Sequence, residues 1–428
     1  RADTDPQGEK SRGSPYAATD CSSEDSLRGN RRSLSRSASE SGERAKVRTS
    51  SKKASYMYAL SGFLYRNVIK RILFLFPADD VHEFFLHTGR RFGRSSFFKS
   101  IIRMAWRYDD PILEQIVCGL VFKNPIGLSA GFDYNADLVE ILPSIGFGFH
   151  TIGTLTHESY EGNTPPMLGR LPRSRSLLVN KGFKNKGITH VLAQMPSGER
   201  SALRGVSIGA TNKAYPDFNA MVENLVAGFR DAERFKNFDY YELNISCPNL
   251  LNLQNLKEQL ASSAGLEVAL MRLSALQLKR PVFIKMPLER TVDDIKKLVD
   301  VAAPHSFISG LIFSNLAKDR SNPAFDRDEV EKAGAGNFSG KPVEKKSNEL
   351  LRYAYKTYHE RFILIGVGGV FTAEDAYQKI CFGASLVQLI TGMVFMGPQQ
   401  IGSINKGVAE LLRKDNFHNI QEAIGVRV

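Results

Sequence analysis

The sequence predicts an α/β protein, namely a (β/α)8 barrel (TIM barrel) preceded by a helical extension. The first observation is size, because 428 residues with 42% hydrophobic composition exceed the roughly 250 residues that such a barrel commonly uses. The second is a regular alternation of short apolar runs and helical patterns after about residue 120. The third is a basic, amphipathic stretch that precedes the alternating region. These patterns divide the chain into a tail (1–53), an extension (54–108) and a barrel (109–428).

The tail is rich in Ser, Arg, Asp and Gly and contains almost no large apolar side chains. Such a segment buries too little apolar surface to offset the entropy lost on ordering, so we predict that it is disordered. It has too many acidic residues for a clean mitochondrial transit peptide, and it lacks the apolar core of a secretion signal.

The chain carries a formal net charge of +12, and much of the excess lies before residue 110. A basic balance suits a polyanion or an anionic membrane surface, and this placement favours a surface role. The four cysteines form no C-x-x-C pair, which argues against a disulfide scaffold and a structural zinc site, so we expect no metal. No run of about 18 uncharged apolar residues occurs, and we predict no membrane-spanning helix.

The extension begins with residues 56–76, "YMYALSGFLYRNVIKRILFLF", whose apolar side chains fall at helical spacing with Arg66, Lys70 and Arg71 mainly on other faces. This pattern predicts an amphipathic, basic helix. Asp80, with Glu83 three residues later, suggests a capping box that opens a second helix. The aromatic-rich "SSFFKSIIRMAW" follows. Such helices either lie on a membrane surface or pack on the main domain, and the basic balance favours the membrane.

Eight strand-like apolar runs, most of them separated by helical patterns, predict the barrel. Parallel strands buried on both faces read as nearly continuous apolar runs, and function resides at their C-terminal ends. The long gaps at about residues 155–204 and 316–346 are expected to form loops over that end. The predicted strands are Asn124–Ala130, Gly148–Thr154, Gly205–Ala210, Tyr240–Ser246, Val282–Pro287, Gly310–Asn315, Phe362–Val367 and Ser385–Ile390.

Glycine-containing turns follow the last two strands, at Gly366–Gly369 and Thr391–Gly392. Barrels commonly bind phosphate between these two loops, through backbone N–H groups. Glycine also serves ordinary tight turns, but the pair of loops favours a phosphate group. Lys285 ends the fifth strand, where a buried ammonium needs a carboxylate or a ligand. Together these residues suggest flavin mononucleotide (FMN), with Lys285 stabilising negative charge at the ring.

Four asparagines, Asn180, Asn244, Asn249 and Asn315, are predicted to converge on the same end of the barrel. Buried amides require hydrogen-bond partners, which a small planar substrate rich in amide groups would provide. Cys247 stands among them in "NISCPN", and its thiol, with a reference pKa of about 8.5, could take a proton from a carbon acid. A buried structural cysteine is the commoner case in general, but a position at a strand end favours catalysis.

Several blocks together resemble the dihydroorotate dehydrogenases, FMN-dependent barrel enzymes of pyrimidine biosynthesis. The blocks are "NPIGLSAGFD", "GFGFHTIGT", "EGNTPPMLGRLP", "LNISCPN", "SGKP", "FILIGVGGV" and "DAYQKICFGASLVQLITGMVF". The resemblance runs from about residue 56 to the C-terminus. "PADDVHEFFLHTGRRFG" looks like the extension of the membrane-associated, quinone-reducing class, in which it forms a lipophilic tunnel toward the flavin.

The resemblance implies roles for particular residues. It implies that Cys247 is the catalytic base and that His82 and Arg170 line the quinone end of the site. It implies that the four asparagines hold the dihydroorotate ring. The residues that it implies for FMN contact are Ala130, Gly131, Thr154, Lys285, Ser339, Gly340, Gly368, Gly369 and Thr391.

The chain departs from the family pattern at three places. The quinone class usually has a serine base, whereas cysteine marks the soluble classes, so the acceptor stays open among quinone, fumarate and NAD. A lysine usually follows "GFD", where this chain has Tyr134. "VNKGFKN" is also spaced differently from the usual pattern, which makes the alignment of Asn180 provisional and leaves Lys181 or Lys184 to supply the missing charge.

The expected function is oxidation of (S)-dihydroorotate to orotate in de novo pyrimidine (UMP) biosynthesis, with FMN as cofactor and a quinone as acceptor. One alternative is a reductase like the FMN-dependent tRNA dihydrouridine synthases, which would suit the basic charge; without a recognisable RNA-binding helical domain we expect no nucleic-acid partner. The other is a catalytically silent, membrane-attached barrel, prompted by Tyr134. We expect peripheral attachment to the cytoplasmic face of a bacterial inner membrane, with the mitochondrial inner membrane as the alternative.

Overall fold

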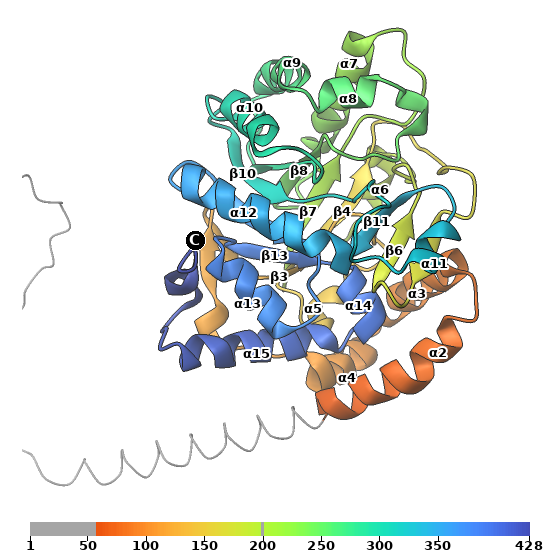
Figure 1. The fold of residues 1–428 in the computed structure, drawn as a ribbon, viewed down its shortest axis with the longest axis vertical. Helices are drawn as coiled ribbons and strands as arrows, with labels where there is room; N and C mark the ends of the chain where they lie inside the picture. Colours follow the sequence, from red (N-terminus) through yellow and green to blue (C-terminus); the bar gives the residue numbers. More distant parts are fainter. Residues whose placement is uncertain (1–56, 198–200) are drawn as a thin grey trace, which may run out of the picture. The chain divides into compact units, whose positions relative to one another are not determined.

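The computed structural model describes residues 57–197 and 201–428 (Figure 1). The tail predicted over residues 1–53 lies outside this part of the chain. Within it, eight parallel strands close into a barrel, which confirms the predicted fold, and each observed strand overlaps its predicted one. In barrel order they are β3 (Ile126–Leu128), β4 (Phe149–Leu155), β7 (Leu203–Ile208), β8 (Tyr240–Asn244), β9 (Val282–Lys285), β10 (Ile308–Phe313), β12 (Ile363–Val367) and β13 (Leu386–Leu389).

Helices surround the strands and bury one apolar face against them, which forms the main hydrophobic core. Capping boxes start two of them: Thr291 with Asp294 before α10, and Thr372 with Asp375 before α13. The helices that follow the extension are α5 (Leu142–Ile145), α6 (Ile188–Gln194), α7 (Phe218–Ala232), α8 (Leu256–Leu260), α9 (Ser263–Ser274), α10 (Val292–Ala302), α11 (Arg327–Glu331), α12 (Glu344–Tyr358), α13 (Ala373–Cys381), α14 (Thr391–Met396) and α15 (Gln400–Lys414).

A second core fills the N-terminal end of the barrel interior with aromatic rings. Phe149 on β4 lies opposite Gly127 on β3, and Tyr240 on β8 lies opposite Gly205 on β7. A Cβ atom at either glycine would lie within 2.3 Å of the facing ring, so only glycine leaves room for it. Phe122 packs against Phe149 with ring centroids 5.3 Å apart. It comes from a hairpin, β1 (Gln115–Val117) and β2 (Leu120–Phe122), that the sequence reading did not predict.

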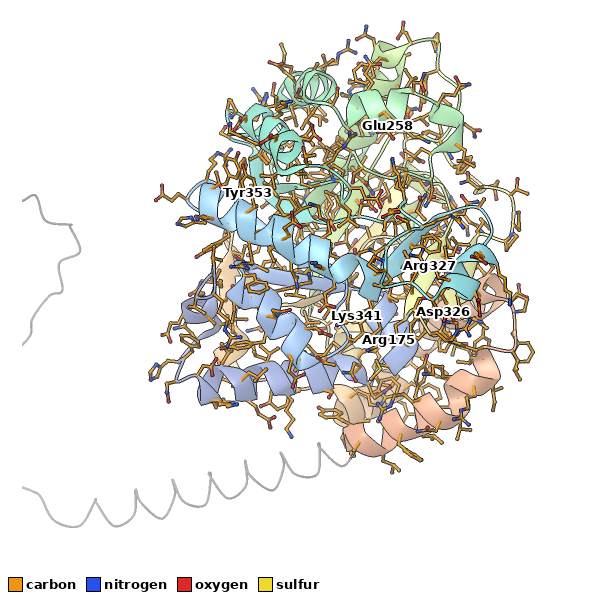
Figure 2. All side chains as sticks on the ribbon, in the orientation of Figure 1. Arg175, Glu258, Asp326, Arg327, Lys341 and Tyr353 are labelled. Carbon is orange, nitrogen blue, oxygen red and sulfur yellow. The ribbon has the colours of Figure 1, made fainter. Side chains whose placement is uncertain are left out.

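The two long gaps form a small antiparallel sheet beside the opposite, C-terminal end of the barrel. Its strands are β5 (Leu168–Leu171), β6 (Ser176–Val179) and β11 (Asn337–Gly340), in the order β11–β6–β5. The prediction of loops at these positions was therefore wrong in part, because strands from two distant segments pair there. Arg175 and Lys341 lie close together at one end of the β11–β6 pair (Figure 2), where the Lys341 N–H donates to the Arg175 carbonyl.

The extension is helical, as predicted. Residues 57–64 are α-helical, Tyr65–Ile69 form a π-helical turn, and α2 (Lys70–Leu73) continues the same helix. It is followed by α3 (Ala78–Gly93) and α4 (Ser96–Trp106), and Figure 1 shows the extension in orange along one side of the barrel. No helix in the described part of the chain is long and apolar enough to cross a membrane.

The predicted capping box at Asp80 and Glu83 is wrong. The N-cap residue of α3 is Pro77, without a side-chain cap, and Asp80 lies within the first turn. Proline favours this boundary because its fixed φ suits a helix start and it needs no hydrogen-bond acceptor. The two neighbouring acids make tertiary contacts instead: Asp79 accepts from the N–H groups of Met167 and Leu168, and Glu83 accepts from Tyr134.

Candidate active site

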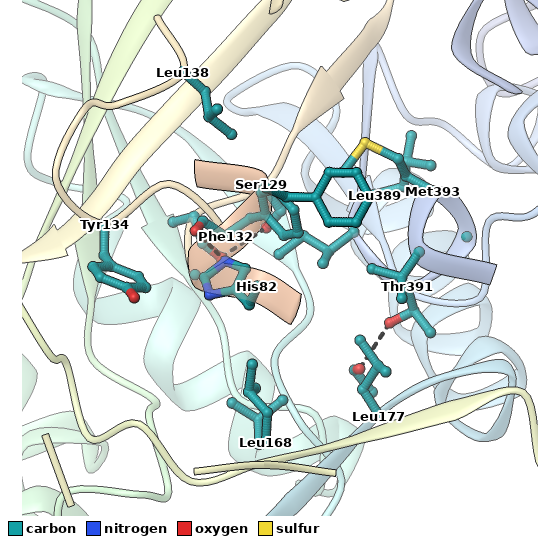
Figure 3. A pocket seen from close by; sticks show the side chains of 18 of the residues that line it. His82, Ser129, Phe132, Tyr134, Leu138, Leu168, Leu177, Leu389, Thr391 and Met393 are labelled. Carbon is teal, nitrogen blue, oxygen red and sulfur yellow. Dashed lines mark hydrogen bonds between the residues drawn. The ribbon is translucent and has the colours of Figure 1, made fainter. Parts of the chain in front are cut away.

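A cavity of about 570 Å³ joins the C-terminal end of the barrel to the extension. Its barrel side is lined by strand-end and loop residues, and its extension side by apolar side chains such as Phe85, Phe92 and Trp106. Figure 3 shows residues of both sides around the same space, including His82 from α3 and Thr391 at the start of α14. The cavity therefore has a polar end and an apolar end.

Amide side chains gather at the polar end. Asn244, the last residue of β8, donates to Thr154 Oγ1 on β4 at 2.9 Å. Asn315, just after β10, donates to Asn244 Oδ1 at 3.4 Å and to Ser246 Oγ at 2.9 Å. Parallel strands bring these residues together because their carboxyl ends share one rim. The predicted convergence of Asn244, Asn249 and Asn315 on the cavity is present in the structure.

Asn180 lies behind the cavity wall rather than in it, since the residues that line the cavity do not include it. Its Oδ1 accepts from Asn163 Nδ2 at 2.9 Å, and the same nitrogen donates to the carbonyl of Asn249. Asn163 Oδ1 in turn accepts from Asn212. The sequence reading missed Asn163 and Asn212 as members of this network. Asn163 lies in the block "EGNTPPMLGRLP", and Asn212 follows the predicted strand Gly205–Ala210.

Cys247 follows β8 and faces the cavity, partly buried. Burial raises the pKa of its thiol to about 11, while a backbone hydrogen bond at Asn249 and the positive charge of Lys285 act in the opposite direction. The thiol is therefore the resting form at neutral pH. Within the described residues, no group of three or more His, Cys, Asp or Glu side chains is arranged to hold a metal ion.

Lys285 ends β9 with its side chain almost fully buried against the cavity. Its Nζ donates to Ser129 Oγ at 3.2 Å, the one acceptor that the described residues offer it. Burial lowers the pKa of Lys285, and the buried carboxylate of Glu242 opposes that shift. A buried ammonium with unused donors favours an anionic or hydrogen-bond-accepting group in the cavity.

The loops after the last two strands also line the cavity. Gly368 and Gly369, which follow β12, have φ angles of +104° and +76°, a region that favours glycine. Thr391 Oγ1 and Ser339 Oγ lie 2.8 Å apart and join the start of α14 to β11 (Figure 3). All residues predicted to contact FMN border this one cavity: Ala130, Gly131, Thr154, Lys285, Ser339, Gly340, Gly368, Gly369 and Thr391.

His82 marks the boundary between the polar and apolar ends. Its Nε2 lies 2.9 Å from the carbonyl oxygen of Phe132, and its ring packs edge-on against the Phe132 ring (Figure 3). Burial, together with the charge of Lys181, lowers the pKa of His82 to about 4, so the ring is neutral at physiological pH. Its Nδ1 lacks a hydrogen-bond partner among the described residues and is free to bind a ligand.

Arg170 on β5 holds the end of the first helix. Its Nη1 donates to the carbonyls of Phe76 at 2.9 Å and Leu73 at 3.4 Å, and its guanidinium stacks 4.7 Å from the Phe74 ring centroid. Carbonyls at a helix C-terminus lack intrahelical partners, so a cation there is stabilising. Arg170 also borders the cavity, and its expected place at the quinone end of the site stays a prediction.

Both lysines proposed to replace the missing cation border the cavity. Lys181 is buried, 3.4 Å from Asp79 Oδ1, and Lys184 is 3.4 Å from Glu83 Oε1. Their ammonium groups lie 5.0 and 5.8 Å from the ring centroid of Tyr134, respectively. Positive charge therefore lies beside Tyr134, but it is paired with acidic residues of α3.

The fold and this cavity define a (β/α)8-barrel enzyme with its site at the C-terminal end of the strands. The family model described as "Dihydroorotate dehydrogenase" matches residues 112–412, and the chain belongs to the dihydroorotate dehydrogenase family. A "Dihydroorotate dehydrogenase (quinone)" from Nocardia farcinica is 33% identical over 86% of this chain and 96% of its own length. A protein of the same name from a Roseiflexus species is 35% identical, and the match covers 84% of this chain and 98% of that protein.

Solved structures show the same fold. The crystal structure of DHODH from Eimeria tenella in complex with ferulenol matches with a TM-score of 0.66 and 24% identity. The match covers 78% of this chain and 95% of that one. A ligand-free structure of the same protein gives a TM-score of 0.67.

Proposed function

We propose that this protein oxidises (S)-dihydroorotate to orotate with bound FMN and passes the electrons to a quinone, a step of de novo pyrimidine biosynthesis. The observation that carries the proposal is the single cavity that connects the amide-rich strand ends, Cys247 and Lys285 with the apolar interior of the extension. A water-soluble ring and a lipophilic acceptor require surfaces of these two kinds.

Quinone is the acceptor that we favour over fumarate and NAD. The relatives compared above are named as quinone-dependent enzymes and are covered over nearly their whole length. The aromatic lining contributed by α3 and α4 suits a lipophilic molecule better than a charged one. We therefore infer that the exchange of the usual serine base for Cys247 alters the strength of the base, and that the electron acceptor is still the quinone of that class.

The cavity suits FMN on the chemistry of its lining. The loops at Gly368–Gly369 and at Thr391 offer backbone and hydroxyl groups at the usual phosphate position of this fold. Lys285 offers unused donors, and Ser314 Oγ is a buried polar atom without a partner among the described residues. FMN, when bound there, would supply the hydride acceptor and the carrier of both electrons.

The side chains of the chain then have separate tasks. Cys247 takes the proton from C5 of dihydroorotate while hydride leaves from C6, and general-base catalysis of this type contributes about 10²–10⁴ in rate. Asn244, Asn249 and Asn315 orient the ring through hydrogen bonds. Asn180, which we place behind the wall, supports Asn163 rather than the ring itself. Lys285 would stabilise the negative charge that develops on the flavin ring when it is reduced.

At the other end of the cavity, His82 and Arg170 would contact the quinone head group. His82 is neutral and presents its free Nδ1, while Arg170 supplies a positive charge held at the C-terminal end of α2. Hydrogen-bond donors and acceptors at the end of an apolar channel orient a quinone without holding its tail.

A membrane surface is the partner that we propose for the extension. Its helices expose apolar side chains beside many basic residues, a composition typical of interfacial helices. We propose peripheral attachment, on the cytoplasmic face of a bacterial inner membrane or, alternatively, on a mitochondrial inner membrane. The exposed large apolar residues of the extension, called the apolar face below, are Met57, Leu60, Phe63, Leu64, Val68, Ile69, Ile72, Leu75, Phe76, Phe84, Phe97, Phe98, Ile101 and Met104.

Anaerobic stopped-flow mixing of the purified yellow protein with dihydroorotate tests the function. We expect the flavin absorbance to bleach, and to return on addition of a short-chain quinone but not of fumarate or NAD. A flavin that does not bleach would contradict the proposal and favour a silent barrel or a reductase for other dihydropyrimidines. Recovery with fumarate or NAD alone would overturn the assignment of the acceptor.

A further inference from the structure

Lys379 is a buried cation that the proposed reaction does not use. It lies on α13 with 1% of its surface exposed. Its Nζ donates to Ser347 Oγ at 3.0 Å and to Asn348 Oδ1 at 2.7 Å, both on the neighbouring helix α12. A buried ammonium is costly to desolvate, so its retention at this position calls for a function.

Ser347 connects this ammonium to the ends of two barrel strands. Its hydroxyl lies 2.6 Å from the carbonyl oxygen of Val367, the last residue of β12, and 3.3 Å from that of Phe313, the last residue of β10. The stem of Lys379 packs against the same strand, since a Cβ at Gly366 would lie 3.0 Å from Lys379 Cδ. Lys379 and Ser347 therefore fix the point at which the chain leaves the barrel.

The chain that leaves the barrel there is the Gly368–Gly369 loop at the cavity. This loop is pressed against the start of α12 and the turn before it. A Cβ at Gly368 would lie 2.7 Å from Val343 Cγ2, and one at Gly369 would lie 2.3 Å from Glu344 Cβ. Because no free space separates the loop from these residues, a shift of the Val367 carbonyl is transmitted to the loop.

We propose that Lys379 is a positioning residue for the phosphate group of the bound cofactor. Through Ser347 it fixes the Val367 carbonyl and so the Gly368–Gly369 loop, and it places a buried positive charge behind that loop. The proposal rests on the proposed function only in that FMN is the ligand of the cavity. Charge-assisted hydrogen bonds of this kind are stronger than neutral ones and hold a loop in a defined geometry.

The charges around Lys379 make its contact with Ser347, and so the position of the Gly368–Gly369 loop, sensitive to pH. Glu344 on α12 and Asp375 on α13 raise its pKa, and Lys341 lowers it; Lys341 is itself 2.5 and 3.2 Å from the two carboxylates. Burial outweighs these effects and lowers the pKa of Lys379 to about 7. A bound phosphate favours the charged form, so FMN affinity is highest below about pH 7 and falls as pH rises above it.

The test compares FMN retention by three variants of the full-length holoenzyme. Lys379→Gln removes the charge but keeps a donor, Ser347→Ala removes the connection to Val367, and Lys346→Gln on the exposed side of α12 is the matched control. Free FMN is measured by its fluorescence after serial dilution, between about pH 6 and pH 9. Melting temperatures are recorded alongside, to separate general destabilisation from a local effect.

We expect the dissociation constant of FMN to rise about 10- to 100-fold for Ser347→Ala and Lys379→Gln near neutral pH, in line with the loss of one charged hydrogen bond. We also expect Lys379→Gln to lose the decline in affinity above about pH 7, which Lys346→Gln retains. Unchanged affinity, or a wild-type decline that persists in Lys379→Gln, overturns the proposal.

If Lys379→Gln does not fold, Ser347→Ala carries the test alone through its FMN affinity. This test is independent of turnover. A wild-type protein that binds FMN but is not bleached by dihydroorotate would contradict the proposed function and leave this inference intact. A wild-type protein that never binds FMN would contradict both.

Discussion

Cys247 illustrates how surroundings set the chemistry of one residue. Removal from water raises the pKa of its thiol, and the cation of Lys285 near the same cavity lowers it, with burial the larger influence. In the proposed reaction, Cys247 is protonated at rest and reacts through a small thiolate population. Its position beside Asn249, at the end of β8, matters as much as its acidity, because a general base must reach the proton that it removes.

Replacement of this thiol should separate cofactor binding from chemistry. In Cys247→Ala we expect FMN content to stay at the wild-type level while the rate of flavin reduction by dihydroorotate falls about 10²–10⁴-fold. Stopped-flow absorbance measures the rate. Cys118→Ser, an exposed cysteine in the β1–β2 turn, is the matched control and should react normally. Wild-type rates in Cys247→Ala would reject the assignment.

The raised pKa of Cys247 gives a further expectation. In the proposed reaction the thiolate is the base, and well below the pKa of about 11 its fraction grows with pH. The rate constant of flavin reduction should therefore rise about tenfold per pH unit through neutrality, without levelling off there. A pH profile of the anaerobic half-reaction measures it, and a plateau that begins below about pH 7 would show a different base.

At the scale of elements, the docking of α3 on β5 joins the extension to the barrel. The contact depends on Asp79, whose Oδ2 accepts from the N–H groups of Met167 and Leu168, where β5 begins, at 2.8 and 3.1 Å. Its Oδ1 faces Lys181. Glu83, one turn further along, accepts from Tyr134 and faces Lys184. Asp79 lies in the first turn of α3, so its negative charge also interacts favourably with the helix dipole.

Loss of the Asp79 contact should weaken this docking. In Asp79→Ala we expect a destabilisation of about 2 kcal/mol, because hydrogen bonds to charged groups are among the stronger ones, and a higher KM for quinone. Bleaching of the flavin by dihydroorotate should change little. Thermal unfolding and the two half-reactions measure these effects. Asp80→Ala is the control, since that exposed neighbour has no such contact; equal effects of the two variants would contradict the account.

The apolar face of the extension should bind lipid. Phe97 and Met104 on α4 are 69% and 77% exposed, and together Phe97→Ser and Met104→Ser should reduce co-sedimentation with anionic phosphatidylglycerol vesicles several-fold. Added salt should weaken the wild-type binding further, because basic residues contribute. Met271→Ser on α9, 62% exposed but outside the extension, should bind as the wild type does. Undiminished binding by the double variant would exclude this face.

At the scale of the whole molecule, the barrel contains buried titratable groups that make its stability depend on pH. His150 on β4 is fully buried, and neither ring nitrogen has a hydrogen-bond partner within the described residues. Burial and the charge of Arg204 lower its pKa to about 3. Since the unfolded chain binds the proton at about pH 6.5, this residue favours unfolding progressively as pH falls below that value.

His150→Leu should therefore make the fold more resistant to acid. Protonation of the unfolded His150 costs about 2 kcal/mol of stability at pH 5, and the variant should lose less stability than the wild type between about pH 7 and pH 5. Chemical unfolding at both pH values measures the difference. His418→Leu removes an exposed histidine and should leave the acid sensitivity as it is; an identical loss in all three proteins would contradict the role of His150.

The sequence by itself determined the barrel and most of the candidate site. Strand runs and the rule that function lies at their carboxyl ends are local patterns, so Cys247, Asn244, Lys285 and the glycine loops fall where they were predicted to lie. Tertiary structure decided the rest. It formed the sheet of β5, β6 and β11 from the two long gaps, and it placed Asn180 behind the cavity through the Asn163 network. It also directed Asp79 and Glu83 to hydrogen bonds with the barrel domain instead of a helix cap. These features depend on pairing between segments far apart in the chain, whose partners are brought together only when the barrel closes.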